Sequence, residues 1–73
     1  MNMDEAEKKA KQFIKGKLPF ESERTVVTGV QYEKDGKIIV AGHARNDREL
    51  LNFRVEFVEN EEAITWRFWN HSC

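Results

Sequence analysis

The side chains best suited to covalent chemistry in this chain are its single cysteine and its two histidines. Cys73 is the last residue, His71 stands two positions before it, and His43 lies in a stretch that reads as a β-strand. A thiol nucleophile needs a base within hydrogen-bond reach and a third group that orients this base. Because a chain end is usually frayed and does not hold such a geometry, we expect no catalytic site and a protein that is not an enzyme.

Metal ions and cofactors are not expected either. The cysteine and the histidines offer three ligands, but their spacing lacks the paired ligands of a structural zinc site. Neighbouring acids stand at expected turns, where carboxylates are solvated and are not tuned for acid catalysis: Glu21, Glu23, Glu61 and Glu62. No phosphate-binding loop or dinucleotide fingerprint is formed by Gly29, Gly36 and Gly42. The sequence therefore predicts no cofactor.

One group of residues near the end of the chain is suited to nucleic-acid binding. Trp69 follows Arg67 by two residues, and pairing of the last two strands places Arg54 opposite Arg67. Arginines beside aromatic rings on an open sheet can stack and hold bases. Like charges directly opposite each other are mildly unfavourable, so this pair serves an anionic partner or is relieved by Glu56. Weak binding of single-stranded nucleic acid by these residues is the alternative function, although the net charge of −1 argues against strong phosphate binding.

An N-terminal helix is expected over residues 3–17. Its apolar side chains are spaced by three and four residues, which is typical of an amphipathic helix: Met3, Ala6, Ala10, Phe13 and Ile14. Asn2 and Glu5 resemble a capping box, and Gly16 and Pro19 are stop signals. The lysine-rich opposite face is expected to be solvated.

The rest of the chain reads as β-structure. Strands are expected at about 25–33, 37–45, 50–59 and 63–69. Short turns join them, which predicts an antiparallel meander in the order 1-2-3-4 with the helix packed on it. The fold class is therefore α+β, and residues 1–73 are expected to form a single domain.

The hairpin turns predict the strand registers. A two-residue turn at Asp35–Gly36 predicts three facing pairs: Tyr32 with Ile39, Val30 with Ala41, and Gly29 with Gly42. A similar turn at Asn60–Glu61 predicts three more: Phe57 with Ile64, Val55 with Trp66, and Phe53 with Phe68. The sequence leaves open which face of the first two strands meets the helix, because the residue count of the turn after Arg45 decides it.

The first hairpin is apolar on both sides, whereas one helix can cover only one face of a sheet. The second side is therefore exposed, wrapped by sheet curvature, or covered by another chain. A chain of 73 residues buries a small core, which a second copy would enlarge. The leading expectation is a non-enzymatic protein-interaction domain whose partner is a second copy of itself or another protein. The expected contact surface comprises Val26, Val30, Tyr32, Ile39, Ala41 and Trp69.

Composition narrows the class of protein. Hydrophobic residues make up 40% of the chain and charged residues 34%, which is too apolar for a disordered chain. No apolar run approaches the roughly 20 residues that cross a bilayer, so no membrane partner is expected. A lone thiol without an export signal fits the reducing cytoplasm, where we expect the protein to reside.

The expected order, one helix followed by four antiparallel strands, is similar to cystatin-like and PepSY-like small domains, which bind proteins. Residues Thr25–Gly29 resemble the glutamine-x-valine-x-glycine loop of cystatins. Threonine stands where that loop has glutamine, and the segment reads as a strand. Protease inhibition is therefore not expected of this chain.

Overall fold

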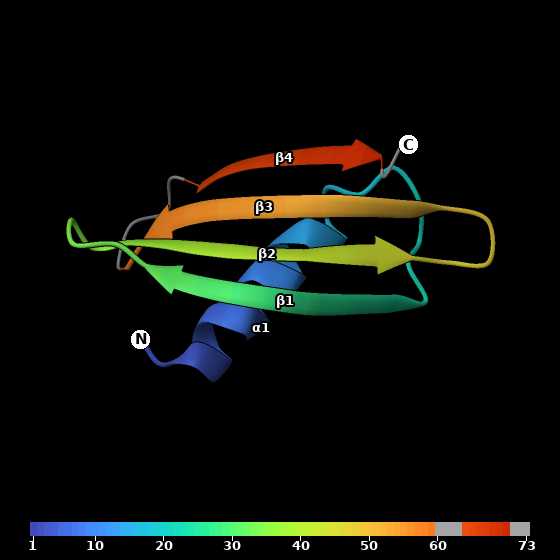
Figure 1. Cartoon of the computed structure of the whole chain (residues 1–73). Helices are drawn as coiled ribbons and strands as arrows, with labels where there is room; N and C mark the ends of the chain where they lie inside the picture. The colour runs from blue at the N-terminus through green and yellow to red at the C-terminus, as the bar shows by residue number, and fades with distance from the viewer. Residues whose placement is uncertain (60–63, 71–73) are drawn as a thin grey trace.

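The computed structural model describes residues 1–59 and 64–70, and this part of the chain forms one helix and four strands. The elements are α1 (Met3–Lys15), β1 (Arg24–Tyr32), β2 (Lys37–Arg45), β3 (Leu50–Val58) and β4 (Ile64–Asn70). The strands form an antiparallel sheet in the order β1-β2-β3-β4, and α1 crosses behind it (Figure 1). The predicted α+β class and the predicted meander are confirmed.

The ends of α1 follow from local hydrogen bonding. The Asn2 side chain accepts a hydrogen bond of 2.9 Å from the backbone N–H of Glu5, which confirms the predicted N-cap. At the other end, the N–H groups of Lys17 and Leu18 both donate to the carbonyl of Ile14, at 2.9 and 3.0 Å. The helix therefore closes with a tight turn at Lys15, two residues before the predicted end.

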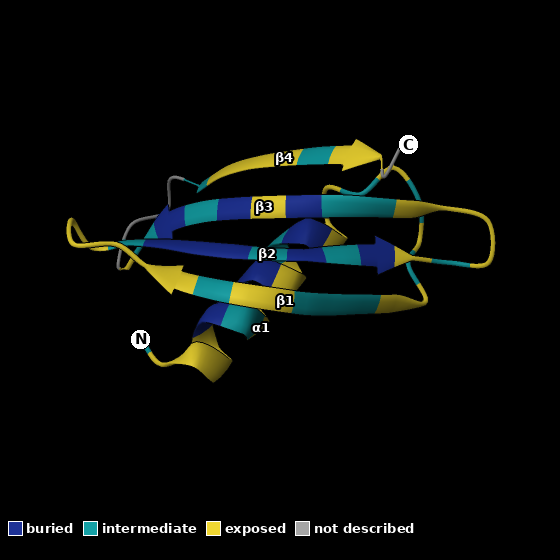
Figure 2. Ribbon diagram, in the orientation of Figure 1, coloured by how far each residue is buried: buried dark blue, intermediate teal, exposed yellow. Residues whose placement is uncertain are grey.

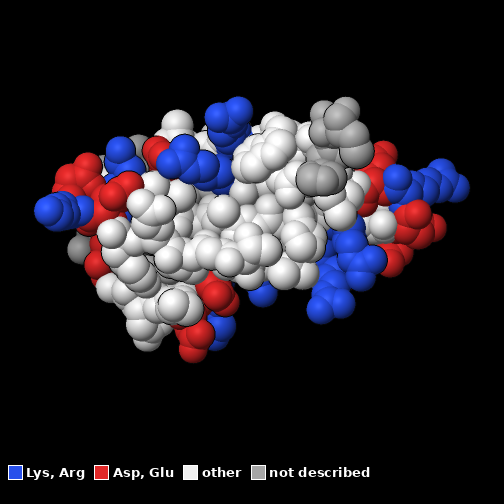
Figure 3. Space-filling view, viewed as in Figure 1, with Lys and Arg blue, Asp and Glu red and all other residues white. Residues whose placement is uncertain are grey.

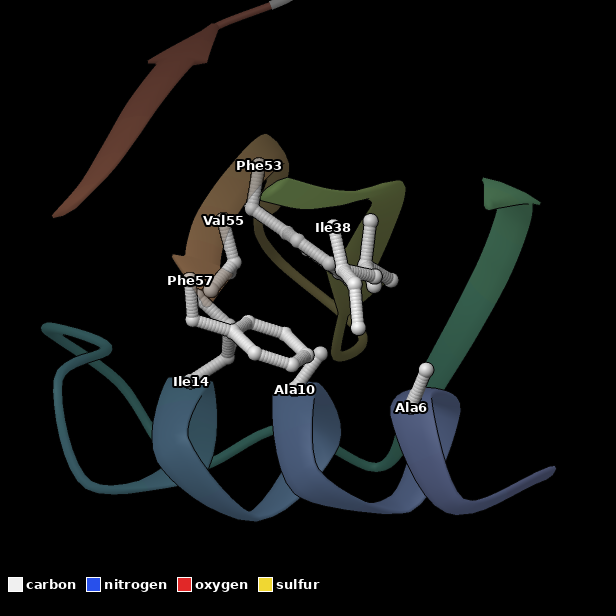
Figure 4. Packing of buried hydrophobic residues seen from close by; sticks show 8 residues of the cluster. Ala6, Ala10, Ile14, Ile38, Phe53, Val55 and Phe57 are labelled. Atoms are coloured by element: carbon white, nitrogen blue, oxygen red, sulfur yellow. The ribbon is translucent and has the colours of Figure 1, made fainter. Parts of the chain in front are cut away.

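The core lies between α1 and the middle of the sheet. The helix contributes small side chains that let its backbone approach closely, Ala6 and Ala10, together with Ile14. Figure 4 shows these residues facing Ile38, Val55 and Phe57 of β2 and β3. All of the core side chains are almost fully buried, and each large one contributes about 1.5–3 kcal/mol by leaving water.

The second half of the sheet has the predicted register. Phe57 faces Ile64, and Phe53 faces Phe68. The predicted Asn60–Glu61 turn itself lies outside the described residues. The Asn46 side chain organises the turn between β2 and β3, because it accepts hydrogen bonds of 2.8 Å from the N–H groups of Arg48 and Glu49.

This turn settles which face of β2 meets the helix. Arg45 faces Leu50 across it, so Val40 faces Val55 and Ile38 faces Phe57. Side chains alternate along a strand, and therefore the even-numbered residues of β2 point toward α1 and the odd-numbered ones away from it.

The predicted register of the first hairpin was wrong by one residue. Tyr32 faces Ile38 and Val30 faces Val40. The reason is the turn: Glu33 N–H donates to Lys37 O at 2.8 Å, while Gly36 N–H donates to Glu33 O at 3.1 Å with Gly36 at φ 91°. This is a three-residue connection, in which only the glycine takes the left-handed conformation, rather than a two-residue turn.

A β-bulge changes the facing of β1. The register shifts between Val27 and Gly29, so Val27 faces Gly42 and the predicted Gly29–Gly42 pair does not form. After the bulge Val30 points toward α1, where it packs on the core. Gly42 has a packing role, because a Cβ there would collide with the carbonyl oxygen of Val26 and lie 2.9 Å from Phe53 Cζ.

Candidate nucleic-acid interface

The outer face of the sheet, defined as the face turned away from α1, is not covered by any described element. Figure 2 shows that the buried residues of the sheet lie on the inner strands β2 and β3, whereas the residues of β1 and β4 are intermediate or exposed. The space-filling view of the outer face shows a broad uncharged middle with charged side chains along its rim and at its ends (Figure 3). This face is therefore an open surface carried by four hydrogen-bonded strands.

An uncharged row crosses the outer face from one edge of the sheet to the other. The strand registers place Val26, His43, Asn52 and Trp69 side by side in this row. Trp69 is 41% exposed, and His43 and Asn52 are half-buried. The row therefore offers one aromatic ring and two hydrogen-bonding side chains without a fixed charge.

Two pairs of facing arginines flank this row. Arg54 faces Arg67 across β3 and β4, and Arg24 faces Arg45 across β1 and β2. By strand alternation, the charged residues on the outer face are five basic ones and one acid: Arg24, Lys37, Arg45, Arg54, Arg67 and Glu56. The outer face is therefore basic, although the whole chain has a net charge of −1.

Both arginines of the Arg54–Arg67 pair contact neighbouring side chains on the outer face. Glu56 accepts an ion-pair contact of 3.0 Å from Arg54 Nη2, which is one of the two alternatives that the sequence left open for this pair. The guanidinium of Arg67 lies 5.5 Å from the centre of the Trp69 ring, within cation–π distance. A shallow hollow of about 170 Å³ is lined by Arg54, Glu56, Thr65, Trp66 and Arg67. The predicted trio of Arg54, Arg67 and Trp69 is thus brought together, and it also lines a wider depression with Asn70.

The residues of the expected protein-contact surface lie on two sides of the sheet. Val30 packs on the core beside α1, and Tyr32 points to the same side, where its hydroxyl donates to Met1 O at 3.4 Å. On the outer face are Val26, Ala41, Trp69 and Ile39, and Ile39 is only 7% exposed. The bulge and the one-residue register shift cause this division.

Sequence reasoning missed the second arginine pair. Arg24 and Arg45 face each other only when the hairpin register is corrected for both the three-residue turn and the bulge. A signal existed, because Gly29 within a strand pattern often marks a bulge. His43 could not be placed beside Asn52 without the residue count of the intervening turn.

The other predicted chemical groups do not gather into a site within the described ranges. Over residues 1–59 and 64–70, no cluster of three or more His, Cys, Asp or Glu side chains could hold a metal ion. His71, Cys73, Glu61 and Glu62 lie outside these ranges. No helix in the described part of the chain has the length and apolar character that crossing a bilayer requires.

Among the titratable groups of the described residues, the Met1 ammonium group has a clearly shifted pKa, and it lies at the end of the sheet, away from the arginine pairs. The ammonium group of Met1 donates a hydrogen bond of 2.6 Å to Glu59 Oε1. This hydrogen bond, helped by the negative charge of Glu59, raises the pKa of the ammonium group above its ordinary value of 8.0.

The resemblance to cystatin-like and PepSY-like domains is one of element order. Residues Thr25–Gly29, which resemble the cystatin loop, belong to strand β1 and include its bulge. Comparison of the chain with protein-family models, curated proteins and solved structures finds no match.

Proposed function

We propose that this chain is a small, non-enzymatic binding domain whose outer face takes single-stranded nucleic acid. The observation that supports this most is the grouping of Arg54, Arg67 and Trp69 on the face of the sheet that is turned away from α1. Single strands are bound by bases that stack on aromatic rings while cationic side chains contact the backbone. This grouping supplies both components.

The two arginine pairs favour an extended anion over a small one. The row of Arg54 and the row of Arg45 are four residues apart along the strands, or about 13 Å. The uncharged row with Trp69 and His43 lies between them, so a chain of phosphates can contact both pairs while a base covers the indole. A facing pair of like charges is unfavourable alone, and a bound anion would relieve the Arg24–Arg45 pair and add to the relief that Glu56 already gives Arg54.

Binding is expected to be weak and to depend on salt. The face offers one exposed tryptophan and a few cations, and each phosphate contact that is lost should lower the salt slope of binding to a single strand by about 0.7. We expect the protein to discriminate little between the four bases, because every base can stack on an aromatic ring.

The test is a titration of a fluorescein-labelled oligothymidine at low salt, followed by anisotropy. Trp69→Ala should weaken binding about tenfold, and Arg67→Gln should weaken it and lower the salt slope. Lys8→Gln, on the exposed face of α1, is the matched control for charge and should leave binding unchanged. No binding by the parent chain, or an equal loss in Lys8→Gln and Arg67→Gln, would reject the proposal.

Protein interaction is the second candidate function, and a different feature favours it. Trp66 and Trp69 are 43% and 41% exposed on β4, a strand with only one neighbour among the described residues. Such a strand can pair with another chain. For either function, the lone cysteine fits a reducing setting, and we propose a cytoplasmic location.

A further inference from the structure

We propose that β4 pairs antiparallel with β4 of a second copy, so that the two sheets join into one continuous sheet. Among the described residues β4 has only β3 as a neighbour, so its other edge presents unpaired backbone groups. Its register with β3 runs without a bulge from Ile64 to Asn70. The strand has one charged residue, Arg67, and two half-exposed tryptophans, a composition that does not discourage pairing.

Two-fold symmetry leaves few registers for this pairing. In a continuous antiparallel sheet, facing residues point to the same side of the sheet. The two-fold axis must therefore lie between one residue of β4 and the same residue of the second copy. Only Trp66, Arg67 or Phe68 at the axis keeps most of β4 paired. Arg67 is excluded, because it would place Arg54 and Arg67 of both copies in a single row of like charges.

Trp66 at the axis gives the best pairs on the helix side of the sheet. Trp66 then faces the partner's Trp66, and Ile64 faces the partner's Phe68. The Phe13 ring already lies 5.1 Å from Trp66 in an edge-to-face arrangement. Pairing therefore joins the two cores through a cluster of four aromatic rings and covers the exposed part of both Trp66 side chains.

The same register matches charges on the outer face. Arg67 faces the partner's Thr65, and the partner's Glu56 stands next to that threonine on β3. Glu56 is therefore about 10 Å away across two strand spacings, within reach of the long arginine side chain. With Phe68 at the axis, Trp66 would face the partner's Asn70, and the arginine pair would gain no acid. Only the Trp66 register matches both faces.

The dimer is expected to be weak. An edge of this length forms about four to six main-chain hydrogen bonds. The area buried by one pair of edge strands is expected to be smaller than the roughly 1,200–2,000 Å² of a standard interface. We therefore expect a dissociation constant in the micromolar range or above.

The experiment uses sedimentation of the 73-residue chain over a wide range of concentrations, with two charge variants at one exposed site. Thr65→Arg places a cation opposite the partner's Arg67 and should raise the dissociation constant at least tenfold. Thr65→Glu places an anion there and should lower it. Within one copy Thr65 faces Glu56, so the same changes act on monomer stability in the opposite directions, and a general loss of folding cannot imitate the result.

Matched controls are available at the other edge. Thr28 on β1 is also exposed, with its hydroxyl donating to Ala41 O at 3.3 Å, and neither Thr28→Arg nor Thr28→Glu should change the dissociation constant. A monomer at every concentration would overturn the proposal. A dimer that responds to neither Thr65 variant would also overturn it, because Thr65 would then lie outside the paired segment.

Discussion

The two edge strands of this sheet differ in how well their exposed edges are suited to pairing with another chain. Strand β1 is interrupted by a bulge, contains the polar residues Thr28 and Gln31, and is backed by α1 (Figure 1). Its last residue, Tyr32, is tied to the carbonyl of Met1. Strand β4 has an unbroken register, two exposed tryptophans and a single charge. A bulge is one of the usual means by which sheets discourage edge pairing, and of the two described edge strands only β1 has one.

This difference separates the roles of the two edges. At the bulge, two residues of β1 lie opposite one residue of β2. As a result, Val30 points toward α1 and packs on the core. The β1 edge is thereby used for the stability of the single chain. The β4 edge places Trp66 and Phe68 where the helix covers them only in part, and it leaves Trp69 on the outer face, so this edge is available to a partner.

The largest effect is expected at Gly42, where β1 and β2 approach most closely. Gly42→Ala should destabilise the fold by about 3 kcal/mol, the upper end of the usual cost of overpacking, because the added carbon meets the Val26 carbonyl and the Phe53 ring, neither of which can move without disturbing the core. Urea unfolding followed by tryptophan fluorescence measures the change. A domain of this size has only about 4–11 kcal/mol in total, so much of the population should unfold on mild heating.

Gly29→Ala is the matched control in the bulge itself. A Cβ at Gly29 meets no atom within 4 Å, and the stability should stay the same or rise by up to about 1 kcal/mol. Similar losses in the two variants would mean that the close approach at Gly42 is not what fixes the β1 edge.

A medium effect is expected where β4 meets the helix. The ring of Trp66 contacts Phe13, and Lys17 Nζ lies 5.0 Å from the centre of the Trp66 ring. A double-mutant cycle with Phe13→Ala and Trp66→Ala should give a coupling of about 0.5–1.5 kcal/mol, measured at low protein concentration so that only monomers contribute. A cycle between Phe13 and Trp69, which points to the outer face, should give no coupling. If both cycles give none, β4 is attached by its pairing with β3 alone.

The same contrast explains what the sequence could predict. The helix is specified by the spacing of Ala6, Ala10 and Ile14, and the second hairpin by the strict alternation from Phe53 to Phe57. These are local patterns, and they yield the facing pair Arg54 and Arg67 directly. The candidate site on β3 and β4 was therefore accessible from the sequence.

The register of the first hairpin could not be predicted from the sequence in the same way. Asp35–Gly36 is compatible with a two-residue turn and with the three-residue turn that forms, and the two differ by one residue in register. The bulge then reverses the facing of Val30 and Tyr32 relative to Val26. Together the turn and the bulge bring Val30 onto the core beside α1, a tertiary contact that no local pattern records, and the Arg24–Arg45 pair depends on both.

The smallest effect is expected at the end of the sheet, where Met1 holds both Tyr32 and Glu59. In the chain that begins at Met1, the pKa of the ammonium group is raised in the folded state. Its contribution to stability is therefore fully present below the ordinary value of about 8 and is lost as the pH rises through the folded value. Glu59→Gln should remove this dependence, so the parent should be slightly more stable than the variant at pH 7 and equal to it near pH 11. The difference between the urea midpoints of the two proteins is measured at each pH. This difference removes the effect of every titratable group that both proteins contain. A constant difference between them at all pH values would show that the ammonium–carboxylate contact does not help to hold the end of β1.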